Sequence, residues 1–154
     1  DYQGYYSVNQ LSRLTESVGK VLSDAQVKLS FFIDSQKLVV MKGNVTVDVE
    51  LECQRCKQPF IQTLECEFCY SPVTNIAQID ELPEIYEPIE FNEFGEIDLI
   101  GAVEDELMLC LPIVPMHLSE HCEVSVAEQV FGELPEELAK KPNPFAVLAS
   151  LKNK

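Results

Sequence analysis

The stretch from Leu51 to Phe60, with the sequence LECQRCKQPF, constrains the fold most strongly because a strand pattern stops there at a C-x-x-C. Before it, every second residue from Val45 to Cys53 is apolar, and after it apolar residues recur at every second position from Leu64 to Tyr70. Such alternation is typical of β-strands that bury one face. We therefore expect a hairpin whose tip carries Cys53 and Cys56, either as half of a metal site or as a plain turn.

The residues before this hairpin predict one helix followed by further strands. From Ser7 to Leu22, apolar residues recur three or four positions apart, which favours an amphipathic helix. The spacing then changes to two, which is the period of a strand. The expected strands span residues 27–33, 38–41, 45–53 and 60–70, with turns at 34–36 and 42–44. The fold class is therefore α+β, with an antiparallel meander of about four strands behind an N-terminal helix.

The second half of the chain predicts a connection and two helices. Residues 72–97 form an acidic connection interrupted by three prolines, with one edge strand expected at Glu87 to Phe91. Asp98 is a suitable N-cap, and the apolar spacing after it predicts a helix that ends at Pro112. The acidic residues 104–106 are expected to form the solvated face of this helix.

The last residues predict a short helix with a basic end. Asn143 and Pro144 form a typical helix start, and the segment that follows is apolar as far as Leu151. A helix this short is not stable alone, so it must dock on its own domain or on another molecule. The whole chain is expected to form a single domain, residues 1–154. Its parts are the helix and meander (1–71), the acidic connection (72–97), the acidic helical part (98–139) and the basic-ended C-terminal helix (140–154).

The cysteines and histidines offer one set of metal ligands. A structural zinc site is formed by four Cys or His side chains, which often arrive in two pairs. Cys53 and Cys56 supply one pair, and His117 with Cys122 supplies the other, with His121 as a substitute for His117. The second pair is not a C-x-x-C, so both a zinc site and a metal-free hairpin tip are compatible with the sequence. No helix start is predicted at Cys53, which argues against a redox pair there.

The other cysteines are expected to be structural. Cys66 and Cys69 also form a C-x-x-C, but they lie inside a strand pattern, so their side chains point to opposite faces and Cys66 belongs to the core. Cys110 lies in an apolar stretch and is expected to be a small buried side chain. A chain of this length without a dense cysteine framework is typical of a reduced, cytosolic protein.

The net charge of −15 is distributed unevenly along the chain. Residues 1–57 are neutral, residues 58–139 contain nineteen Asp and Glu but no Lys or Arg, and the last fifteen residues carry four Lys and no acid. Such an acidic stretch repels a phosphate backbone, because nucleic-acid affinity depends mostly on Lys and Arg. It is either a solvated face or a docking surface for a strongly basic protein.

The sequence offers little for catalysis or for membrane insertion. It contains no phosphate-binding loop, nucleophile elbow or H-E-x-x-H, and nothing places an oxyanion hole beside Cys122. The longest apolar run, Leu107 to Met116, contains two prolines and is shorter than the roughly 20 residues that span a membrane. We therefore expect a non-enzymatic, cytoplasmic protein. The chain begins at Asp1 rather than Met, which indicates a processed or truncated form.

Several further stretches follow one another in a distinctive order. They are DYQG at 1–4, LECQRC at 51–56, YEPIE at 86–90, NEFGEIDL at 92–99, VEDE at 103–106, LP at 111–112 with His117 and Cys122, and KPNPFAVLASLK at 141–152. Together they resemble the YceD family, the large ribosomal RNA subunit accumulation proteins of bacteria and plastids, and most closely its gammaproteobacterial members. The resemblance covers nearly the whole chain.

This resemblance implies a role in the synthesis, processing or stability of large-subunit ribosomal RNA, without an established reaction. Many members outside this branch carry a second C-x-x-C in the region of His117 to Cys122, which is the pattern of a four-cysteine metal site. This chain departs from that pattern there. Members also typically begin with a short basic segment before the equivalent of Asp1, which this chain lacks.

Charge and resemblance together predict an adaptor that binds a basic ribosomal protein or assembly factor and contacts ribosomal RNA indirectly. The residues expected to contact this partner lie in the acidic half and the tail: Glu93, Glu96, Asp98, Glu104, Asp105, Glu106, Phe145 and Leu148. One alternative is direct RNA binding through the N-terminal half and the tail lysines. The other is a cysteine-dependent enzyme that uses Cys122 or the Cys53 and Cys56 pair.

Overall fold

A computed structural model describes residues 1–122 and residue 124 of the chain. Its strands are β1 (Tyr2–Tyr6), β2 (Lys20–Val21), β3 (Ala25–Ile33), β4 (Val39–Glu52), β5 (Pro59–Val73) and β6 (Glu87–Glu90). Its helices are α1 (Ser12–Ser17), α2 (Ile76–Ile79) and α3 (Leu99–Leu109), with short 3-10 helices η1 (Val8–Gln10) and η2 (Ser119–His121). The α+β class predicted from the sequence is confirmed.

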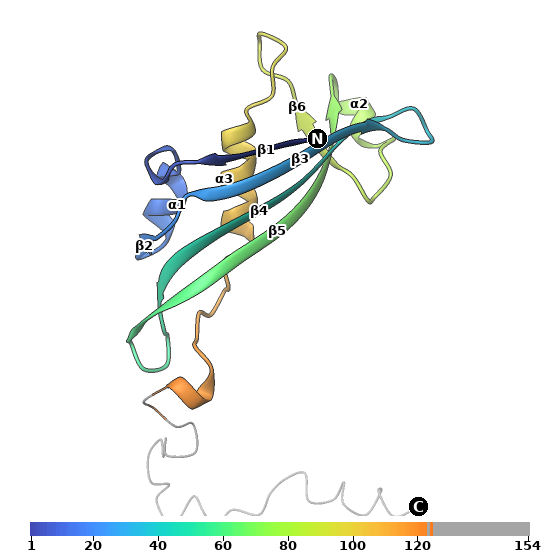
Figure 1. Cartoon of the computed structure of the whole chain (residues 1–154). Coiled ribbons are helices and arrows are strands. Elements are labelled where there is room, and N and C mark those ends of the chain that lie inside the picture. The colour runs from blue at the N-terminus through green and yellow to red at the C-terminus, as the bar shows by residue number, and fades with distance from the viewer. Residues whose placement is uncertain (123, 125–154) are drawn as a thin grey trace, which may run out of the picture.

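All the strands belong to one sheet with the order β1-β3-β4-β5-β6, and β2 pairs with β4 beside this path. The pairs β1–β3, β3–β4 and β4–β5 are antiparallel, whereas β6 runs parallel to β5. The long hairpin of β4 and β5 dominates the molecule and carries its turn at one end (Figure 1). The prediction of about four strands was therefore too low. The predicted meander is antiparallel, and the one parallel pair involves the separate edge strand β6.

The core lies between one face of the sheet and the helices α1 and α3. Every second residue of β4 from Val45 to Leu51 is buried, as the alternation predicted. On α3, Val103 and Leu107 are buried against this face, and on α1 Leu14 joins them. In Figure 1, α3 passes behind the sheet and α1 lies beside it.

The N-terminal helix is much shorter than predicted. The apolar spacing favoured a helix from Ser7 to Leu22, but residues 2–6 form an edge strand and α1 covers only Ser12–Ser17. The helix stops because Val18 is extended and the Gly19 N–H donates to the Glu50 carbonyl at 3.1 Å, where β2 starts to pair with β4. Sheet pairing across long sequence distances therefore overrides the local helical period.

The turn predicted at residues 42–44 was also wrong, because β4 continues through them. Gly43 pairs with Phe68 on β5, and a Cβ atom at Gly43 would lie 2.0 Å from the Phe68 Cζ atom. Gly43 therefore lets an aromatic ring lie against the strand backbone. By contrast, the predicted turn at Asp34 is present, and the Asp34 carboxylate accepts hydrogen bonds from the N–H groups of Gln36 and Leu38.

The second half follows the predicted outline with one major difference. The edge strand predicted at Glu87 to Phe91 is present as β6, and Asp98 caps α3 by accepting from the Gly101 N–H at 3.0 Å. However, the side chains of Glu104 and Glu106 are buried, so the prediction of a solvated face was wrong for both. Each carboxylate has a specific partner in the core, which the sequence spacing alone does not reveal.

The cysteines follow the prediction only in part. Cys66 is buried and Cys69 lies on the opposite face of β5, as expected. Cys110, however, is exposed and is paired with Cys66, with the two Cα atoms 6.4 Å apart. The expectation of a buried Cys110 was therefore wrong.

Among the described residues, no helix is long and apolar enough to cross a membrane. The helix predicted at 143–151, with Phe145 and Leu148, lies outside the described residues. The division of the chain into four parts therefore stays a prediction.

Candidate functional site

The tip of the β4–β5 hairpin is a tight turn that presents two thiols. The Cys53 N–H donates to the Gln58 carbonyl at 2.9 Å, and the Lys57 N–H donates back to the Cys53 carbonyl at 2.8 Å. Lys57 adopts a left-handed backbone conformation with φ of 64°, which reverses the chain before Pro59. This turn directs the side chains of Cys53 and Cys56 to the same side.

The segment after α3 docks on this turn through Gln54 and Arg55. The Gln54 N–H donates to the Pro115 carbonyl at 2.9 Å. The Arg55 guanidinium donates from Nη2 to the His117 carbonyl at 3.1 Å and from Nε to the Cys122 Sγ at 3.0 Å. Arg55 therefore holds both residues that the second segment contributes to the site.

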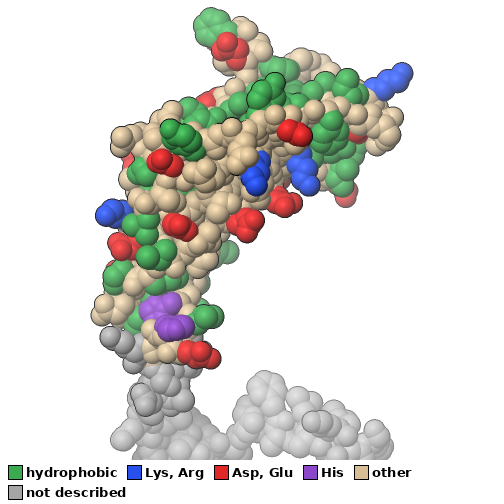
Figure 2. Space-filling view, viewed as in Figure 1, with side chains coloured by type: hydrophobic (Ala, Val, Ile, Leu, Met, Phe, Trp, Pro, Cys, Tyr) green, Lys and Arg blue, Asp and Glu red, His purple; other side chains and the backbone are tan. Residues whose placement is uncertain are grey.

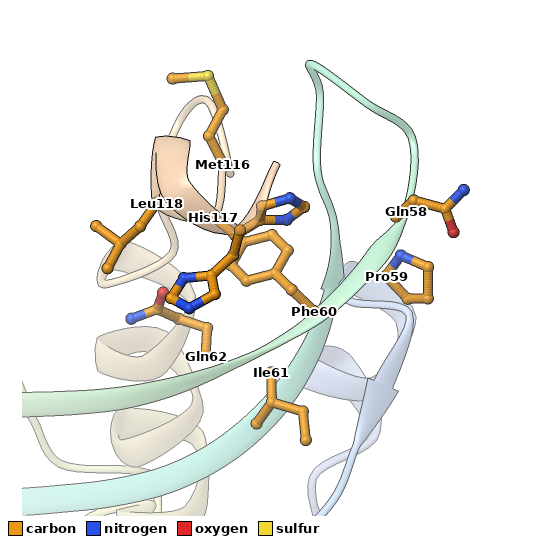
Figure 3. Close-up of a pocket in the computed structure, with 9 residues that line it drawn as sticks. Gln58, Pro59, Phe60, Ile61, Gln62, Met116, His117 and Leu118 are labelled. Carbon is orange, nitrogen blue, oxygen red and sulfur yellow. The ribbon is translucent and has the colours of Figure 1, made fainter. Parts of the chain in front are cut away.

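Four candidate ligands converge where the two segments meet. Cys53, Cys56, His117 and Cys122 each bring one ligand atom, and these atoms all lie within 4.8 Å of one another. The His117 Nε2 lies 3.4 Å from the Cys56 Sγ, and its Nδ1 is buried with no hydrogen-bond partner among the described residues. The Phe60 ring lies edge-on to the His117 ring at 5.4 Å and limits its position (Figure 3).

The thiols at this site differ in their affinity for protons. Burial raises the pKa of Cys53, but backbone N–H groups of Cys56, Arg55 and His117 point at its sulfur and lower the pKa to about 6. The pKa of Cys56 is raised, first by burial and then by the neighbouring sulfurs of Cys53 and Cys122. The site thus stabilises one thiolate well, whereas further thiolates repel one another unless a cation joins them.

This donor set fits a structural zinc ion. Three Cys and one His are a common tetrahedral zinc set, and a four-ligand site leaves no open position for catalysis. Cys53 would bind as a thiolate stabilised by N–H groups, and His117 would bind through a ring nitrogen. His121, considered as a substitute, is not in the cluster but lies at the edge of an adjacent hollow of about 630 Å³.

A second hollow, which we name the acidic cleft, lies at the other end of β5 between β6 and α3. Its volume is about 680 Å³, and it is lined by Glu87, Pro88, Ile89, Glu90, Asp98, Gly101, Ala102, Asp105, Met108, Leu109, Tyr70 and Arg13. The four acidic residues are exposed, whereas Ile89, Ala102 and Met108 are buried or half-buried and form an apolar floor. Among the described residues, Arg13 is the one basic side chain that lines it, and Arg13 is paired with Asp105 at 2.5 Å.

The negative charges of the cleft act on the buried Glu106 and Tyr70 beneath it. Burial raises the pKa of Glu106 beneath the cleft; the hydrogen bond from the Tyr70 hydroxyl opposes this shift, and the negative charges of Glu87 and Asp105 add to it. Burial likewise raises the pKa of Tyr70, and the hydrogen bond and charge of Glu106 add to this shift. The cleft is therefore a place where added positive charge would be favourable.

The profile of the family described as large ribosomal RNA subunit accumulation protein YceD matches residues 41–152, which is more than half of the chain. The chain belongs to the YceD family. A Haemophilus influenzae protein described by the same words is 77% identical over 154 residues, which cover all of this chain and 88% of that protein. No solved structure matches the chain.

The region matched by the YceD profile contains all four candidate ligands and nearly the whole acidic cleft. These four ligands were predicted from the sequence, and the structure brings them together. Arg55, which contacts two of them, was not predicted, because an Arg between two cysteines has no distinctive spacing. In Figure 2 the two histidines lie together at the hairpin-tip end of the molecule.

The predicted partner contacts in this YceD chain are found in three settings. Asp98 and Asp105 line the acidic cleft, and Glu93 and Glu96 are exposed on the loop between β6 and α3. Glu104 and Glu106 are buried and do not reach the surface. Phe145 and Leu148 lie outside the described residues. Glu87 and Glu90 were missed, although the prediction of an acidic edge strand at these positions could have revealed them.

Proposed function

We propose that this YceD-family chain supports the accumulation of large-subunit ribosomal RNA in the cytoplasm as a non-enzymatic assembly factor. It does so by binding a basic segment of a ribosomal protein or assembly factor in the acidic cleft. The family membership supports the ribosomal role, and the cleft supports the mode of action. The protein contacts ribosomal RNA through that partner rather than directly.

The observation that carries this proposal is the one-sided charge of the second half. From residue 58 to residue 122, twelve carboxylates are exposed and there is no Lys or Arg. Such a surface repels phosphate and attracts Lys and Arg over a range of about 10 Å at 0.1 M salt.

The acidic cleft fits an extended segment that is rich in Lys and Arg. Long basic side chains lay their aliphatic stems on apolar surface and keep their charged ends in contact with acids or water. Ile89, Ala102 and Met108 offer such an apolar surface, and Glu87 and Glu90 stand at its edge. Among the described residues β6 is an edge strand of the sheet, so its outer edge adds backbone groups that an extended peptide can pair with.

The metal centre has a structural part in this proposal. Cys53, Cys56, His117 and Cys122 hold zinc and fasten the hairpin tip to the segment that follows α3. The chain between the two ligand pairs contains β5, β6 and α3, which form the cleft. A zinc ion would therefore fix both ends of this part of the chain. The zinc ion takes no part in a reaction.

A capture experiment with matched variants tests the proposal. The tagged chain is mixed with a bacterial lysate at low salt, and bound proteins and RNA are identified. We expect basic ribosomal or ribosome-associated proteins to be retained by the wild type and lost from the double variant Glu87→Lys with Glu90→Lys.

The control makes the same charge change between α2 and β6, with Asp80→Lys and Glu84→Lys, both of which are exposed and outside the cleft. It should retain most of the bound protein. The proposal fails if the two variants lose the partner equally, or if the purified wild type binds ribosomal RNA when no other protein is present.

A further inference from the structure

A groove runs along β5 beside the metal centre, separate from the acidic cleft. Two hollows of about 630 and 310 Å³ lie next to each other there and share Gln62 and Met116 as lining residues. One wall is β5, and the other is the segment from Cys110 to His121. We name this feature the β5 groove.

Several large apolar side chains are exposed along the β5 groove. Leu118 is 71% exposed, Met116 51% and Val114 49%, and the neighbouring Ile113 is 96% exposed. Within residues 1–122, no other part of the chain covers these side chains. A contiguous apolar strip on a soluble protein usually marks a surface where something docks.

The chain itself supplies a matching segment. Residues 144–151, with the sequence PFAVLASL, are apolar around the whole circumference of a helix, with Ser150 as the one polar side chain. A helix that is apolar all round is stable only when it is buried. This segment therefore needs an apolar site, and the β5 groove offers one.

The position where the described chain ends brings this segment close to the groove. Cys122 belongs to the metal centre, and His121 lines the groove itself. The connection from residue 125 to residue 143 spans about 25 Å on average if it is flexible, so the local concentration of the tail at the groove reaches the millimolar range. A tethered segment at this concentration docks even when its intrinsic affinity is modest.

The charges also match. Glu65 lines the groove and Glu120 lies exposed beside it. Lys57, which adjoins the lining residue Gln58 in the sequence, is paired with Glu52 at 3.1 Å. The tail carries Lys140 and Lys141 before its apolar part and Lys152 and Lys154 after it, and no acid. Both ends of the segment are thus attracted to the rim of the groove.

We propose that residues 144–151 dock as a short helix in the β5 groove. This assigns the tail to its own domain rather than to a partner, and Phe145 and Leu148 become contacts within the chain. The proposal is independent of the acidic cleft, so either can fail without the other.

Oxidation of Met116 by dilute hydrogen peroxide tests this docking. Sulfoxide formation at the three methionines of the full chain is followed by mass spectrometry of peptides, in the wild type and in the double variant Phe145→Asp with Leu148→Asp. We expect Met116 to react about tenfold more slowly in the wild type, which corresponds to a docked population of about 90%. Met41, which is 1% exposed, must stay protected in both proteins and thereby shows that the fold is intact.

The control is Phe94→Asp, because Phe94 is 84% exposed and lies outside the groove. This variant should match the wild type. Equal Met116 rates in the wild type and the double variant would overturn the proposal. So would protection that rises with protein concentration, which indicates a second copy, or protection that appears only with added lysate, which indicates a partner.

Discussion

Arg55 shows how a single residue can join two parts of a chain that lie far apart in sequence. Its guanidinium contacts His117 and Cys122, and its neighbours Cys53 and Cys56 supply the other two candidate ligands. A positive charge beside several thiols lowers the cost of the thiolate form. The same residue thus orders the site and compensates part of its charge, as partners of metal ligands commonly do.

The ligand cluster predicts the zinc content of the purified protein. We expect about one zinc per chain in protein prepared with zinc and without chelator, because a four-ligand Cys and His site binds this ion tightly. Cys122→Ser should lose most of the zinc, whereas Cys69→Ser should keep it because Cys69 lies outside the cluster. Atomic emission on the three proteins checks this, and equal zinc in both variants would contradict the assignment.

The buried Glu106 predicts a pH dependence of stability. Burial, with the charges of Glu87 and Asp105, raises its pKa in the folded state above the unfolded value. The neutral form therefore favours folding; its contribution is complete below the unfolded pKa and is lost as pH rises through the folded pKa.

Glu106→Gln keeps an acceptor for the Tyr70 hydroxyl but cannot ionise. Urea unfolding at several pH values above 4 should show a smaller decrease of stability with rising pH for this variant than for the wild type. Parallel curves for the two proteins would show that Glu106 does not titrate as described.

At the scale of elements, β4 depends on the absence of a side chain at Gly43. Gly43→Ala places a Cβ atom against the buried Phe68 ring, which must move, and we expect a loss of about 1–3 kcal/mol in the free energy of unfolding. Gly4→Ala on β1 is the matched control, since among the described residues nothing lies within 4 Å of its added Cβ. Chemical denaturation of both variants should therefore rank Gly43→Ala as clearly less stable.

The start of α1 depends on a residue from another helix. Leu11 provides no side-chain cap, and the Glu104 carboxylate on α3 instead accepts from the N–H groups of Arg13 at 2.9 Å and Leu14 at 3.2 Å. Glu104→Ala leaves both donors without a partner and should cost about 1–3 kcal/mol of stability. Glu104→Gln keeps an acceptor and should cost less, as thermal unfolding of the two variants can show. A similar loss in both would assign the effect to charge rather than to the cap.

The elements that depend on local spacing could be predicted, and those that depend on distant pairing could not. Alternation predicted the face of β4 and β5, and the Asp98 cap predicted the start of α3. The strand at Tyr2–Tyr6 depends on pairing with β3, and α1 is short because β2, which follows it, pairs with β4. The spacing of residues along the chain does not indicate either pairing. The choice of His117 over His121 depends on how the segment after α3 meets Arg55, so the spacing of four residues left it open.

At the scale of the whole molecule, β5 connects the two candidate sites. It begins at Pro59, next to the metal centre, and ends at Val73, beside β6 and the acidic cleft. Fifteen residues of strand span about 50 Å, so the two sites act as separate ends of one rigid hairpin. In Figure 1 the turn that carries the ligand cluster and strand β6 beside the acidic cleft lie at opposite ends of the hairpin. Under the proposed function, a metal would serve the fold at one end and a partner would bind at the other.

The most direct test of this account is the level of large-subunit ribosomal RNA in cells whose own copy of the gene encodes the cleft variant Glu87→Lys with Glu90→Lys. The matched strain carries Asp80→Lys with Glu84→Lys, and both proteins are confirmed to be present at wild-type amounts. We predict that the ratio of large- to small-subunit ribosomal RNA falls in the cleft strain, to the level of cells without the protein, and stays normal in the matched strain. A normal ratio in the cleft strain would contradict the account.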